Sequence, residues 1–450
     1  MIVMKFGGTS IKDSEAIRRV IGIIKSQIKL KPVIVLSAIA GATNQLEEIS
    51  ISAKSGEIIK SENNLFQLKE RHLKIVKETL SGTEHYERVV GLIEKYFREI
   101  ESLIKGVYLL SELTPKASAR ILSYGELLST TIITSVMEVG GVDSELLDSR
   151  QLIKTDRNFL KAEPQVDIIK ELVSAQLIPI VKAGKVSVLQ GFIGSNDIGE
   201  TTILGRGGSD YTASLIGLAI NADGIEIWTD VDGMLTADPR MIEGTKLIEI
   251  ISFEEAAELA YFGAKVLHPL TIQPAVEKNI PVWIKNSLFP ERQGTKIVRT
   301  ATEKYNSVRA IASKEKIIVV NIFSTRMLNS YGFLKRIFEI FEKHQTSVDL
   351  IATSEVNVSL TLDDDSRLDD IVRDLSEFSI VNVETDKSLI CVVGSNIKNS
   401  KGIAGRIFNV LSDYNITMIS QGASLINISF VLERAVLKPA MQKLHNIFFN

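Results

Sequence analysis

The stretch Lys5-Phe6-Gly7-Gly8-Thr9-Ser10 lies between an apolar run, Ile2-Val3-Met4, and a helical pattern that begins after Asp13. The Asp13 side chain can cap this helix, whose apolar residues recur at helical spacing: Ile17, Val20, Ile21, Ile24 and Ile28. Because glycine has no Cβ, the N–H groups of a glycine pair can approach phosphate oxygens closely, and a following helix adds the positive end of its dipole. The stretch therefore predicts a strand, a phosphate-binding loop and a helix.

A second stretch of the same character is Gly205-Arg206-Gly207-Gly208-Ser209-Asp210, which precedes a helical segment at residues 211–222. Its Ser209 and Asp210 stand where a helix cap is expected. A tight turn would explain an isolated glycine pair, but a turn has no need of the charged residues that flank both pairs. Neither stretch matches the P-loop or dinucleotide-binding motif. Together they predict a phosphoryl-transfer site of another kinase lineage.

Length, charge and cysteine content limit the class of protein. A chain of 450 residues is too long for one compact core and predicts two or three domains. Its 52 lysines and arginines against 55 aspartates and glutamates provide no electrostatic footprint for nucleic acid or an anionic membrane. The one cysteine, Cys391, lies in an apolar run and predicts a buried strand residue in a reducing cytoplasm. We therefore expect a cytoplasmic protein that acts on small molecules.

Membrane and metal signals are missing from the sequence. No apolar stretch reaches the length of a membrane span, and the amino terminus lacks the order of a signal peptide. The five histidines are scattered without the spacing of a zinc site. We expect no membrane partner, no nucleic-acid partner and no metal site built from protein ligands alone.

Up to about residue 300, short apolar runs alternate with helical patterns, which is typical of a parallel sheet covered by helices. The expected strands are residues 33–36, 186–190, 225–229 and 281–284. Residues 57–110 are long, charged and helical, so they predict a helical insertion that lies against the sheet. The polar stretch 289–295 is either a linker between domains or a loop inside one.

The last third of the chain contains an internal repeat. Seven identities fall at one ungapped offset: Gly332 with Gly402, Arg336 with Arg406, Ile337 with Ile407, Phe338 with Phe408, Ser354 with Ser424, Asn357 with Asn427, and Ser359 with Ser429. Each copy reads as an apolar run, a helix opened by glycine, and a strand that ends in Asn-x-Ser. With room for a further helix and strand, the order predicts a small α/β module repeated twice.

Taken together, these segments resemble the aspartokinases of the monofunctional, lysine-regulated kind. Besides the two glycine-rich loops, the resemblance rests on an ordered series of motifs: Leu36-Ser37-Ala38, Gly41-Ala42-Thr43-Asn44, Gly125-Glu126-Leu127, Gln190-Gly191-Phe192-Ile193-Gly194, Trp228-Thr229-Asp230-Val231, Asp238-Pro239-Arg240 and Phe262-Gly263-Ala264-Lys265-Val266-Leu267-His268-Pro269. The resemblance implies an α/β chain with an amino-acid-kinase fold at residues 1–300, in which helices sandwich a sheet. A linker with a first βαββαβ ACT module would follow at 301–385, and a second ACT module at 386–450.

Similar enzymes transfer the γ-phosphoryl group of ATP, bound with Mg²⁺ mainly through its phosphates, to the side-chain carboxylate of L-aspartate. The product is 4-phospho-L-aspartate, the first intermediate towards lysine, threonine and methionine. A carboxylate acceptor is already ionised at neutral pH, so catalysis needs alignment and charge neutralisation but no general base. The resemblance implies that Lys5 lies near the β- and γ-phosphates, that Gly7 and Gly8 donate backbone N–H groups, and that Asp210 orients Lys5.

The resemblance also implies the other binding residues. The planar fork of Arg206 suits the α-carboxylate of aspartate, Glu126 can pair with its α-ammonium group, and Thr43 and Ser209 complete the pocket with hydroxyls. The positions that match ATP-binding residues of relatives are Thr229, Asp230, Leu235, Arg240, Lys265 and Val266. Leu235 stands where many relatives carry tyrosine, so we do not expect adenine stacking there.

The first ACT copy resembles a lysine-binding site at ten positions: Met327, Ser330, Gly332, Phe333, Leu334, Ser347, Val348, Asp349, Thr353 and Glu355. The acids Asp349 and Glu355 can counter the two ammonium groups of lysine, and the second copy lacks both. We therefore expect feedback inhibition by lysine. ACT modules commonly pair between chains, which implies a homodimer with the effector at its seam, and possible pairing of dimers into a tetramer.

Two other readings remain open. The chain can be another member of the same kinase superfamily that acts on glutamate, N-acetylglutamate, carbamate or a nucleotide, although Arg206, Glu126 and the ACT pair favour aspartate. It can also be a non-catalytic amino-acid sensor that keeps the fold, although intact Lys5, Asp210 and Lys265 favour catalysis.

Overall fold

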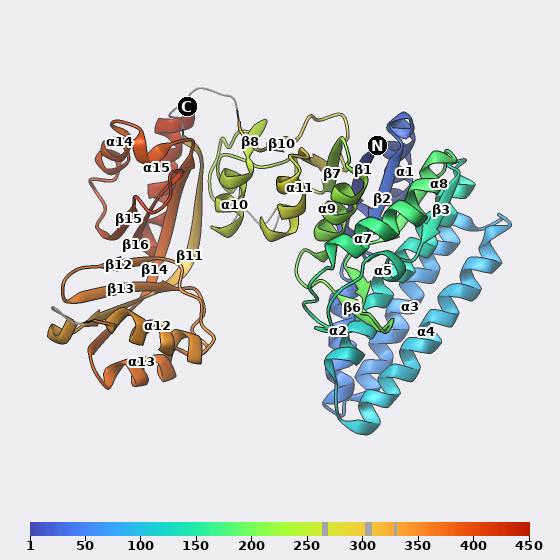
Figure 1. Ribbon diagram of the computed structural model, residues 1–450, viewed down its shortest axis with the longest axis horizontal. Coiled ribbons are helices and arrows are strands. Elements are labelled where there is room, and N and C mark those ends of the chain that lie inside the picture. Colours follow the sequence, from blue (N-terminus) through green and yellow to red (C-terminus); the bar gives the residue numbers. More distant parts are fainter. Residues whose placement is uncertain (263–268, 302–307, 328–330) are drawn as a thin grey trace. The chain divides into compact units, whose positions relative to one another are not determined.

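The computed structural model describes residues 1–262, 269–301, 308–327 and 331–450. The chain divides into two compact units, and Figure 1 shows it coloured along its length. The first unit comprises Met1–Met234, Glu249–Phe253 and Val266–Thr300, and the second comprises Leu235–Ile248, Glu254–Lys265 and Ala301–Asn450. The chain therefore passes into the second unit twice before residue 300, in addition to the crossing that the sequence predicts there.

An eight-stranded sheet in the order β3-β4-β2-β1-β7-β9-β10-β8 forms the first unit. Its strands are β1 (Ile2–Phe6), β2 (Pro32–Leu36), β3 (Ser144–Leu147), β4 (Val186–Gln190), β7 (Gly224–Thr229), β8 (Ile250–Ser252), β9 (Val282–Asn286) and β10 (Thr295–Val298). All neighbouring pairs from β3 to β9 are parallel, which places the carboxyl ends of these strands at one edge. The four strands predicted from the sequence are present.

The polar stretch 289–295 leads from β9 to β10, which pair in antiparallel fashion within this sheet. It is therefore a connection inside the first unit and not a linker between domains. Residues 57–110 form the predicted helical insertion, with α3 (Ile58–Leu80) and α4 (His85–Leu110) packed against each other and against α2 and α5. Figure 1 shows these two long helices side by side.

Helices and a small hairpin complete the first unit. The helix α5 (Pro115–Val139) contacts β2, β3 and β4, whereas α9 (Gly208–Ile220) contacts β1, β2 and β7. Its other α-helices are α1 (Ser14–Ser26), α2 (Ala42–Lys54), α6 (Ser149–Leu152), α7 (Val166–Leu172), α8 (Ile178–Lys182) and α11 (Gln273–Glu277), and its hairpin is formed by β5 (Ile193–Ser195) and β6 (Thr201–Ile203). As predicted, the Asp13 side chain caps α1 by accepting a hydrogen bond from the Ala16 N–H at 2.8 Å.

The second unit contains a six-stranded antiparallel sheet in the order β12-β13-β11-β14-β16-β15. Its strands are β11 (Val308–Phe323), β12 (Ile351–Thr353), β13 (Asn357–Leu362), β14 (Ile380–Gly394), β15 (Ile416–Gln421) and β16 (Asn427–Glu433). Its helices are α10 (Phe253–Tyr261, whose first residue belongs to the first unit), α12 (Phe333–Lys343), α13 (Leu368–Ser376), α14 (Ile403–Val410) and α15 (Leu437–Phe449).

The internal repeat is visible in the second unit. Gly332 and Gly402 occupy the N-cap positions of α12 and α14 with φ values of 80° and 79°, a conformation that favours glycine. The Asn-x-Ser sequences at Asn357 and Asn427 begin β13 and β16, so the prediction that they end a strand is wrong. In the first copy, the Asn357 carbonyl closes a turn by accepting from the Ser354 N–H at 2.8 Å, so the polar pair marks the exit from a turn.

The two repeats share their long strands. The first half of β11, from Val308 to Lys314, pairs with the second half of β14, whereas the second half of β11 pairs with β13 and the first half of β14. The second repeat therefore takes one strand from chain that precedes the first repeat. Each repeat has its own apolar core, and Cys391 is buried in β14 as predicted.

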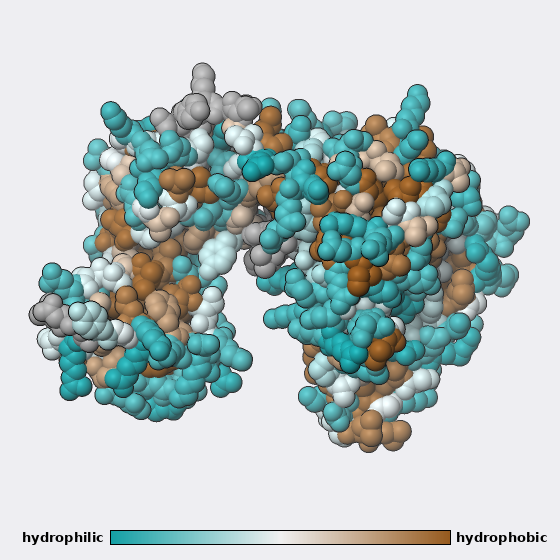
Figure 2. Space-filling view, in the orientation of Figure 1, coloured by the Kyte–Doolittle hydropathy of each residue, from teal (hydrophilic) through white to brown (hydrophobic). Residues whose placement is uncertain are grey.

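In the described part of the chain, no helix combines the length and the apolar character that crossing a bilayer requires. The face drawn in Figure 2 is largely hydrophilic. Apolar side chains that remain exposed on the sheet of the second unit are Phe323, Ile351, Ile380 and Ile419.

Candidate functional site

An ion pair joins the two glycine-rich stretches that opened the sequence analysis. Lys5 lies in β1 and Asp210 lies in the first turn of α9, and the Lys5 Nζ is 2.6 Å from the Asp210 Oδ1. Their side chains are only 11% and 13% exposed, so the attraction is screened less than that of a surface pair. The expected pairing of Lys5 with Asp210 is therefore present, and it holds the ammonium group near the carboxyl end of β1.

The loop after β1 is held against the loop after β2. A Cβ on Gly8 would lie 2.7 Å from the Ala38 carbonyl oxygen and 3.1 Å from the Ala40 nitrogen, so only glycine allows this approach. The Gly8 carbonyl accepts a hydrogen bond from the Ala40 N–H at 3.1 Å. The Gly7 N–H donates to the Trp228 carbonyl at 3.0 Å. This differs from the expectation that the Gly7 N–H serves phosphate, because the backbone of β7 already uses it.

The second glycine-rich stretch begins α9 differently from the prediction. Gly207, with φ at 71°, is the N-cap residue, and Ser209 and Asp210 lie within the first turn. Because Gly207 begins the helix in a left-handed conformation and no side chain caps it, the Asp210 carboxylate does not serve as a cap and can pair with Lys5. A Cβ on Gly191 would lie 2.5 Å from the Ser209 Cβ, so the chain after β4 packs closely on this turn. Arg206 is exposed in the loop before the helix.

Glu126 lies in the middle of α5 with only 3% of its surface exposed. Its Oε1 accepts a hydrogen bond from the Ala38 N–H at 3.1 Å, and its Oε2 has no hydrogen-bond partner among the described residues. Burial raises the pKa of Glu126 to about 8 because the charged form is removed from water. Thr43, in the first turn of α2, lies close by, since a Cβ on Gly125 would be 3.6 Å from its hydroxyl oxygen. Glu126 is thus a buried carboxyl group with one oxygen that no described residue bonds.

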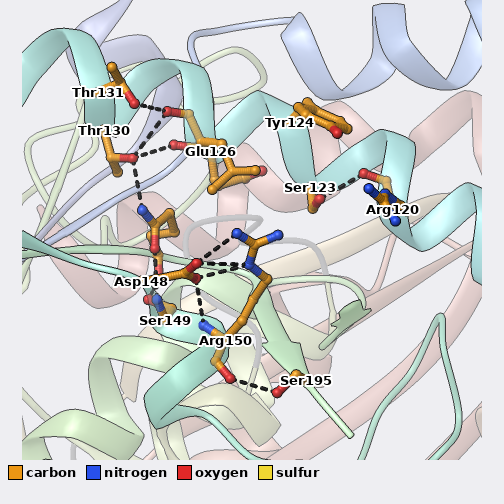
Figure 3. Close-up of polar contacts among 12 residues, drawn as sticks. Arg120, Ser123, Tyr124, Glu126, Thr130, Thr131, Asp148, Ser149, Arg150 and Ser195 are labelled. Carbon is orange, nitrogen blue, oxygen red and sulfur yellow. Dashed lines mark hydrogen bonds and ion pairs between the residues drawn. The ribbon is translucent and has the colours of Figure 1, made fainter. Parts of the chain in front are cut away.

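A chain of buried hydrogen bonds holds the backbone at Glu126. The Thr130 hydroxyl donates to the Glu126 carbonyl at 2.8 Å and accepts from the Gln190 side-chain amide at 3.1 Å. The Gln190 side-chain oxygen accepts from the Ser149 N–H at 2.8 Å. Figure 3 shows this link between α5 and the chain that follows β3. The sequence reasoning missed Thr130 and Ser149, and the only signal for the link was Gln190 in a quoted motif.

Asp148 and Arg150 lie beside this network in Figure 3. The Arg150 guanidinium group donates to both Asp148 carboxylate oxygens, at 2.6 to 3.1 Å, and hydrogen bonding to this carboxylate raises the pKa of Arg150. The Arg150 carbonyl accepts from the Ser195 hydroxyl at 2.6 Å. These contacts order the loop after β3, which sequence reasoning had not singled out.

The residues expected at ATP are divided between the two units. Thr229 and Asp230 follow β7 in the first unit, where the Thr229 hydroxyl donates to the Asp230 carboxylate at 3.1 Å. Leu235 and Arg240 belong to the second unit, and Asp238 binds the exposed Arg240 guanidinium group through both carboxylate oxygens. Lys265 and Val266 lie outside the described residues.

The residues expected at the effector lie in the first repeat, except Ser330, which is outside the described residues. The side chains of Met327, Phe333 and Val348 pack against the core of that repeat. The residues Gly332, Leu334, Ser347, Thr353 and Glu355 are exposed. Asp349 differs from them, because only 2% of its side chain is exposed.

A protein-only metal site is not evident in the described ranges, which contain no group of three or more histidine, cysteine, aspartate or glutamate side chains placed to hold an ion. The site instead offers one ammonium group, a close glycine approach and a buried carboxylate. These groups suit a phosphorylated ligand beside a cationic one.

Comparison with known proteins defines the class. A model of the amino acid kinase family matches residues 1–286, and a model of the ACT domain matches residues 390–448. Among curated proteins, lysine-sensitive aspartokinase 3 of Escherichia coli is 37% identical, covering 100% of this chain and 99% of that protein. Chloroplastic aspartokinase 1 of Arabidopsis thaliana is 37% identical over 99% of this chain and 80% of its own length. The chain belongs to the aspartokinase family.

Solved structures agree. Crystal structures of E. coli aspartokinase III, one with aspartate and ADP and one with lysine and aspartate, match with TM-scores of 0.86 and 0.85 at 36% identity, and both matches cover 100% of each chain. Aspartate kinase of Clostridium acetobutylicum matches with a TM-score of 0.83 at 29% identity, also over the full length of both chains. The amino-acid-kinase fold with C-terminal ACT modules is therefore confirmed.

Proposed function

We propose that this chain is an aspartate kinase that transfers the γ-phosphoryl group of ATP to the side-chain carboxylate of L-aspartate. The bond between the γ-phosphorus and the oxygen that bridges to the β-phosphate breaks, a bond to the carboxylate oxygen forms, and ADP leaves. The observation that carries this proposal is the buried ion pair of Lys5 and Asp210 at the ends of two glycine-rich loops. An ammonium group held in this way can counter the charge that spreads over the transferring phosphoryl group.

Lys5 and Asp210 are the catalytic pair in this proposal. The α-ammonium group of aspartate would bind Glu126, whose Oε2 has no partner among the described residues, and the α-carboxylate would bind Arg206. The hydroxyls of Thr43 and Ser209 would complete the substrate pocket. The aspartate and ADP in the E. coli structure support this choice of ligands.

For the nucleotide, we assign Gly8 beside Lys5, with Thr229, Asp230, Leu235, Arg240, Lys265 and Val266 as further contacts, and Gly7 as a shaping residue. Magnesium would be held mainly through the phosphates, and it would neutralise their charge when bound. The close approach of Gly8 to the Ala38 backbone, which a Cβ would prevent, holds this loop against the loop after β2.

We further propose that lysine inhibits the enzyme by binding the first repeat at Asp349 and Glu355. The enzyme would catalyse the first step of a pathway that leads to lysine by way of diaminopimelate, so this inhibition would be feedback by the end product. The lysine sensitivity of the E. coli relative supports this effector. A homodimer through the repeats, which can pair further into a tetramer, would use exposed apolar residues of the edge strands, such as Ile351 of β12 and Ile419 of β15. Residues 1–300 would form the catalytic domain, and residues 301–385 and 386–450 would form the two regulatory modules. The protein would act in the cytoplasm, where Cys391 stays reduced.

An aspartyl-hydroxamate assay tests the function. Purified protein is incubated with ATP, Mg²⁺ and hydroxylamine, with aspartate, glutamate or N-acetylglutamate as acceptor and with lysine or threonine added. Hydroxamate formed from aspartate alone, and suppressed by lysine, is the expected result. Product from another acceptor would identify a different kinase of this superfamily. Lysine binding without any product would identify a sensor.

A further inference from the structure

The side chain of Lys314 already pairs with Asp349, the acid that the sequence analysis assigns to the effector lysine. Lys314 lies in β11, and its Nζ is 2.8 Å from the Asp349 Oδ2. The same Nζ is 3.0 Å from the Asp363 Oδ2, so Lys314 bridges two carboxylates. The Lys314 side chain is 16% exposed, and those of Asp349 and Asp363 are 2% and 49% exposed.

The second oxygen of Asp349 is also engaged. The Tyr261 hydroxyl donates to the Asp349 Oδ1 at 2.6 Å, and the Lys314 Nζ lies 4.5 Å from the centre of the Tyr261 ring. Burial, together with the hydrogen bond to Asp349, raises the pKa of Tyr261, so the phenol stays protonated as a donor. These three side chains form a compact set within the second unit: Tyr261, Lys314 and Asp349.

A carboxylate that is almost fully buried requires a cation, and here that cation belongs to the chain itself. A ligand ammonium group cannot simply add to the set, because two ammonium groups on one carboxylate oxygen repel each other in a poorly solvated site. The ligand must therefore replace Lys314. Asp363 offers Lys314 a second, half-exposed partner, so the displaced ammonium group keeps one carboxylate.

We propose that Lys314 is a built-in competitor of the effector: its ammonium group holds the place at Asp349 that an ammonium group of free lysine takes, and lysine binding shifts Lys314 to Asp363. This proposal rests on the proposed lysine regulation and extends it to residues of β11 and α10. Because the competitor is part of the chain, the apparent affinity for lysine is the intrinsic affinity multiplied by the fraction of molecules in which Lys314 has left Asp349.

Tyr261 connects this exchange to another part of the sequence. It is the last residue of α10, and it contacts both partners of the Lys314–Asp349 pair. When Lys314 leaves, Tyr261 loses the cation over its ring while its hydroxyl keeps the hydrogen bond to Asp349. The exchange at the effector acid therefore changes the surroundings of the helix end that directly precedes the Phe262-to-Pro269 motif.

The test is lysine binding to the full-length protein, measured by calorimetry without ATP or aspartate. Lys314→Met removes the competitor and should lower the dissociation constant for lysine by about tenfold. Asp363→Asn removes the alternative partner and should raise the constant, because Lys314 then has only Asp349. Lys316→Met and Asp365→Asn are matched controls, since this neighbouring pair is exposed and 3.9 Å apart, and neither should change lysine binding.

Weaker or unchanged lysine binding in Lys314→Met would overturn the proposal, as would unchanged binding in Asp363→Asn. If Lys314→Met does not fold because Asp349 is left unpaired, lysine binding to Asp363→Asn alone tests the proposal. The Asp363 side chain is half exposed, so its replacement leaves the core intact. A wild-type protein that does not bind lysine contradicts the proposed regulation itself. If the wild type binds lysine and both variants bind it with the same dissociation constant as the wild type, only the role of Lys314 is contradicted.

Discussion

The Ala38 N–H donates a hydrogen bond to the buried Oε1 of Glu126 over 3.1 Å, and so ties the loop after β2 to the middle of α5. Backbone hydrogen bonding lowers the pKa of this carboxyl group less than burial raises it, and the resulting pKa is about 8. The free protein therefore holds Glu126 protonated at pH 7. If the substrate ammonium group binds here as proposed, Glu126 must release this proton.

The first prediction concerns that proton. Aspartate binding at pH 7 should release close to one proton, and aspartate affinity should rise about tenfold per pH unit until pH approaches 8. Calorimetric titrations in buffers of different ionisation enthalpy measure the released proton. Glu126→Gln should abolish both the release and the pH dependence. Aspartate binding with no proton exchange would contradict the role of Glu126.

The same shift predicts the pH dependence of stability. The folded protein keeps the Glu126 proton up to about pH 8, whereas the unfolded chain loses it near pH 4.5. The contribution of Glu126 to the free energy of unfolding is therefore largest below pH 4.5 and falls as pH rises to about 8. Urea unfolding at several pH values, compared between wild type and Glu126→Gln, measures this contribution. Parallel pH profiles of the two proteins would contradict it.

Lys5→Ala should lower turnover by about 100-fold or more, because it removes the ammonium group that counters the charge of the transferring phosphoryl group. The hydroxamate assay measures turnover, and circular dichroism checks the fold. Lys12→Ala is the matched control, since Lys12 is exposed just beyond the same loop. Near-normal turnover of a folded Lys5→Ala protein would refute the assignment.

Arg206→Ala should raise the KM for aspartate far more than the KM for ATP. The lost bidentate contact is worth about 2 to 4 kcal/mol, roughly 30- to 900-fold in binding. Arg157→Ala serves as the control, because Arg157 forms an exposed pair with Asp197 in the same unit. Equal effects of Arg206→Ala on both substrates would place Arg206 at the nucleotide or in the structure.

Gly8→Ala should destabilise the protein by about 1 to 3 kcal/mol and abolish activity, because the new Cβ would meet the Ala38 carbonyl oxygen at 2.7 Å. A Cβ added at Gly106 in α4 would have no neighbour within 4 Å, so Gly106→Ala should stabilise the helix by about 0.5 to 1 kcal/mol. Urea unfolding of both variants measures the contrast. Similar stabilities would show that the close approach at Gly8 carries no strain.

Asp349→Ala should relieve inhibition by lysine, because it removes a carboxylate that pairs with the effector. Lysine titration of the kinase activity, with each protein normalised to its own activity without lysine, measures the relief. An Asp349→Ala protein that remains fully sensitive to lysine, or a wild type that responds only to threonine, would show that the effector is assigned wrongly.

Local sequence signals were enough for much of the fold. Buried parallel strands such as β2 are continuous apolar runs, and Asp13 at the start of an amphipathic pattern is a cap signal that tertiary structure did not override. The start of α9 was mispredicted, because polar Ser209 and Asp210 looked like a cap while Gly207 provided one through its backbone conformation. Local composition does not distinguish these two ways of beginning a helix.

The ion pair of Lys5 and Asp210 was predictable, because each residue stands in a glycine-rich motif that indicates its chemistry. It was not predictable where a contact depends on which backbone groups meet, as between Ala38 and Glu126 or between Gly7 and Trp228. The pairing of Lys314 with Asp349 was also invisible, because the order of strands in the sheet brings them together and neither residue belongs to a motif that names the other.

The sharing of β11 between the two repeats has a consequence for how the chain is synthesised. The segment from Val308 to Lys314 leaves the ribosome before the whole first repeat, yet its partner in the sheet, from Leu389 to Gly394, is made only after that repeat. Until then, this half of β11 is an unpaired strand edge attached to a repeat that can already fold. The first repeat can thus be complete while the second still waits for its chain, which makes the final strand pairing a late, long-range step in folding.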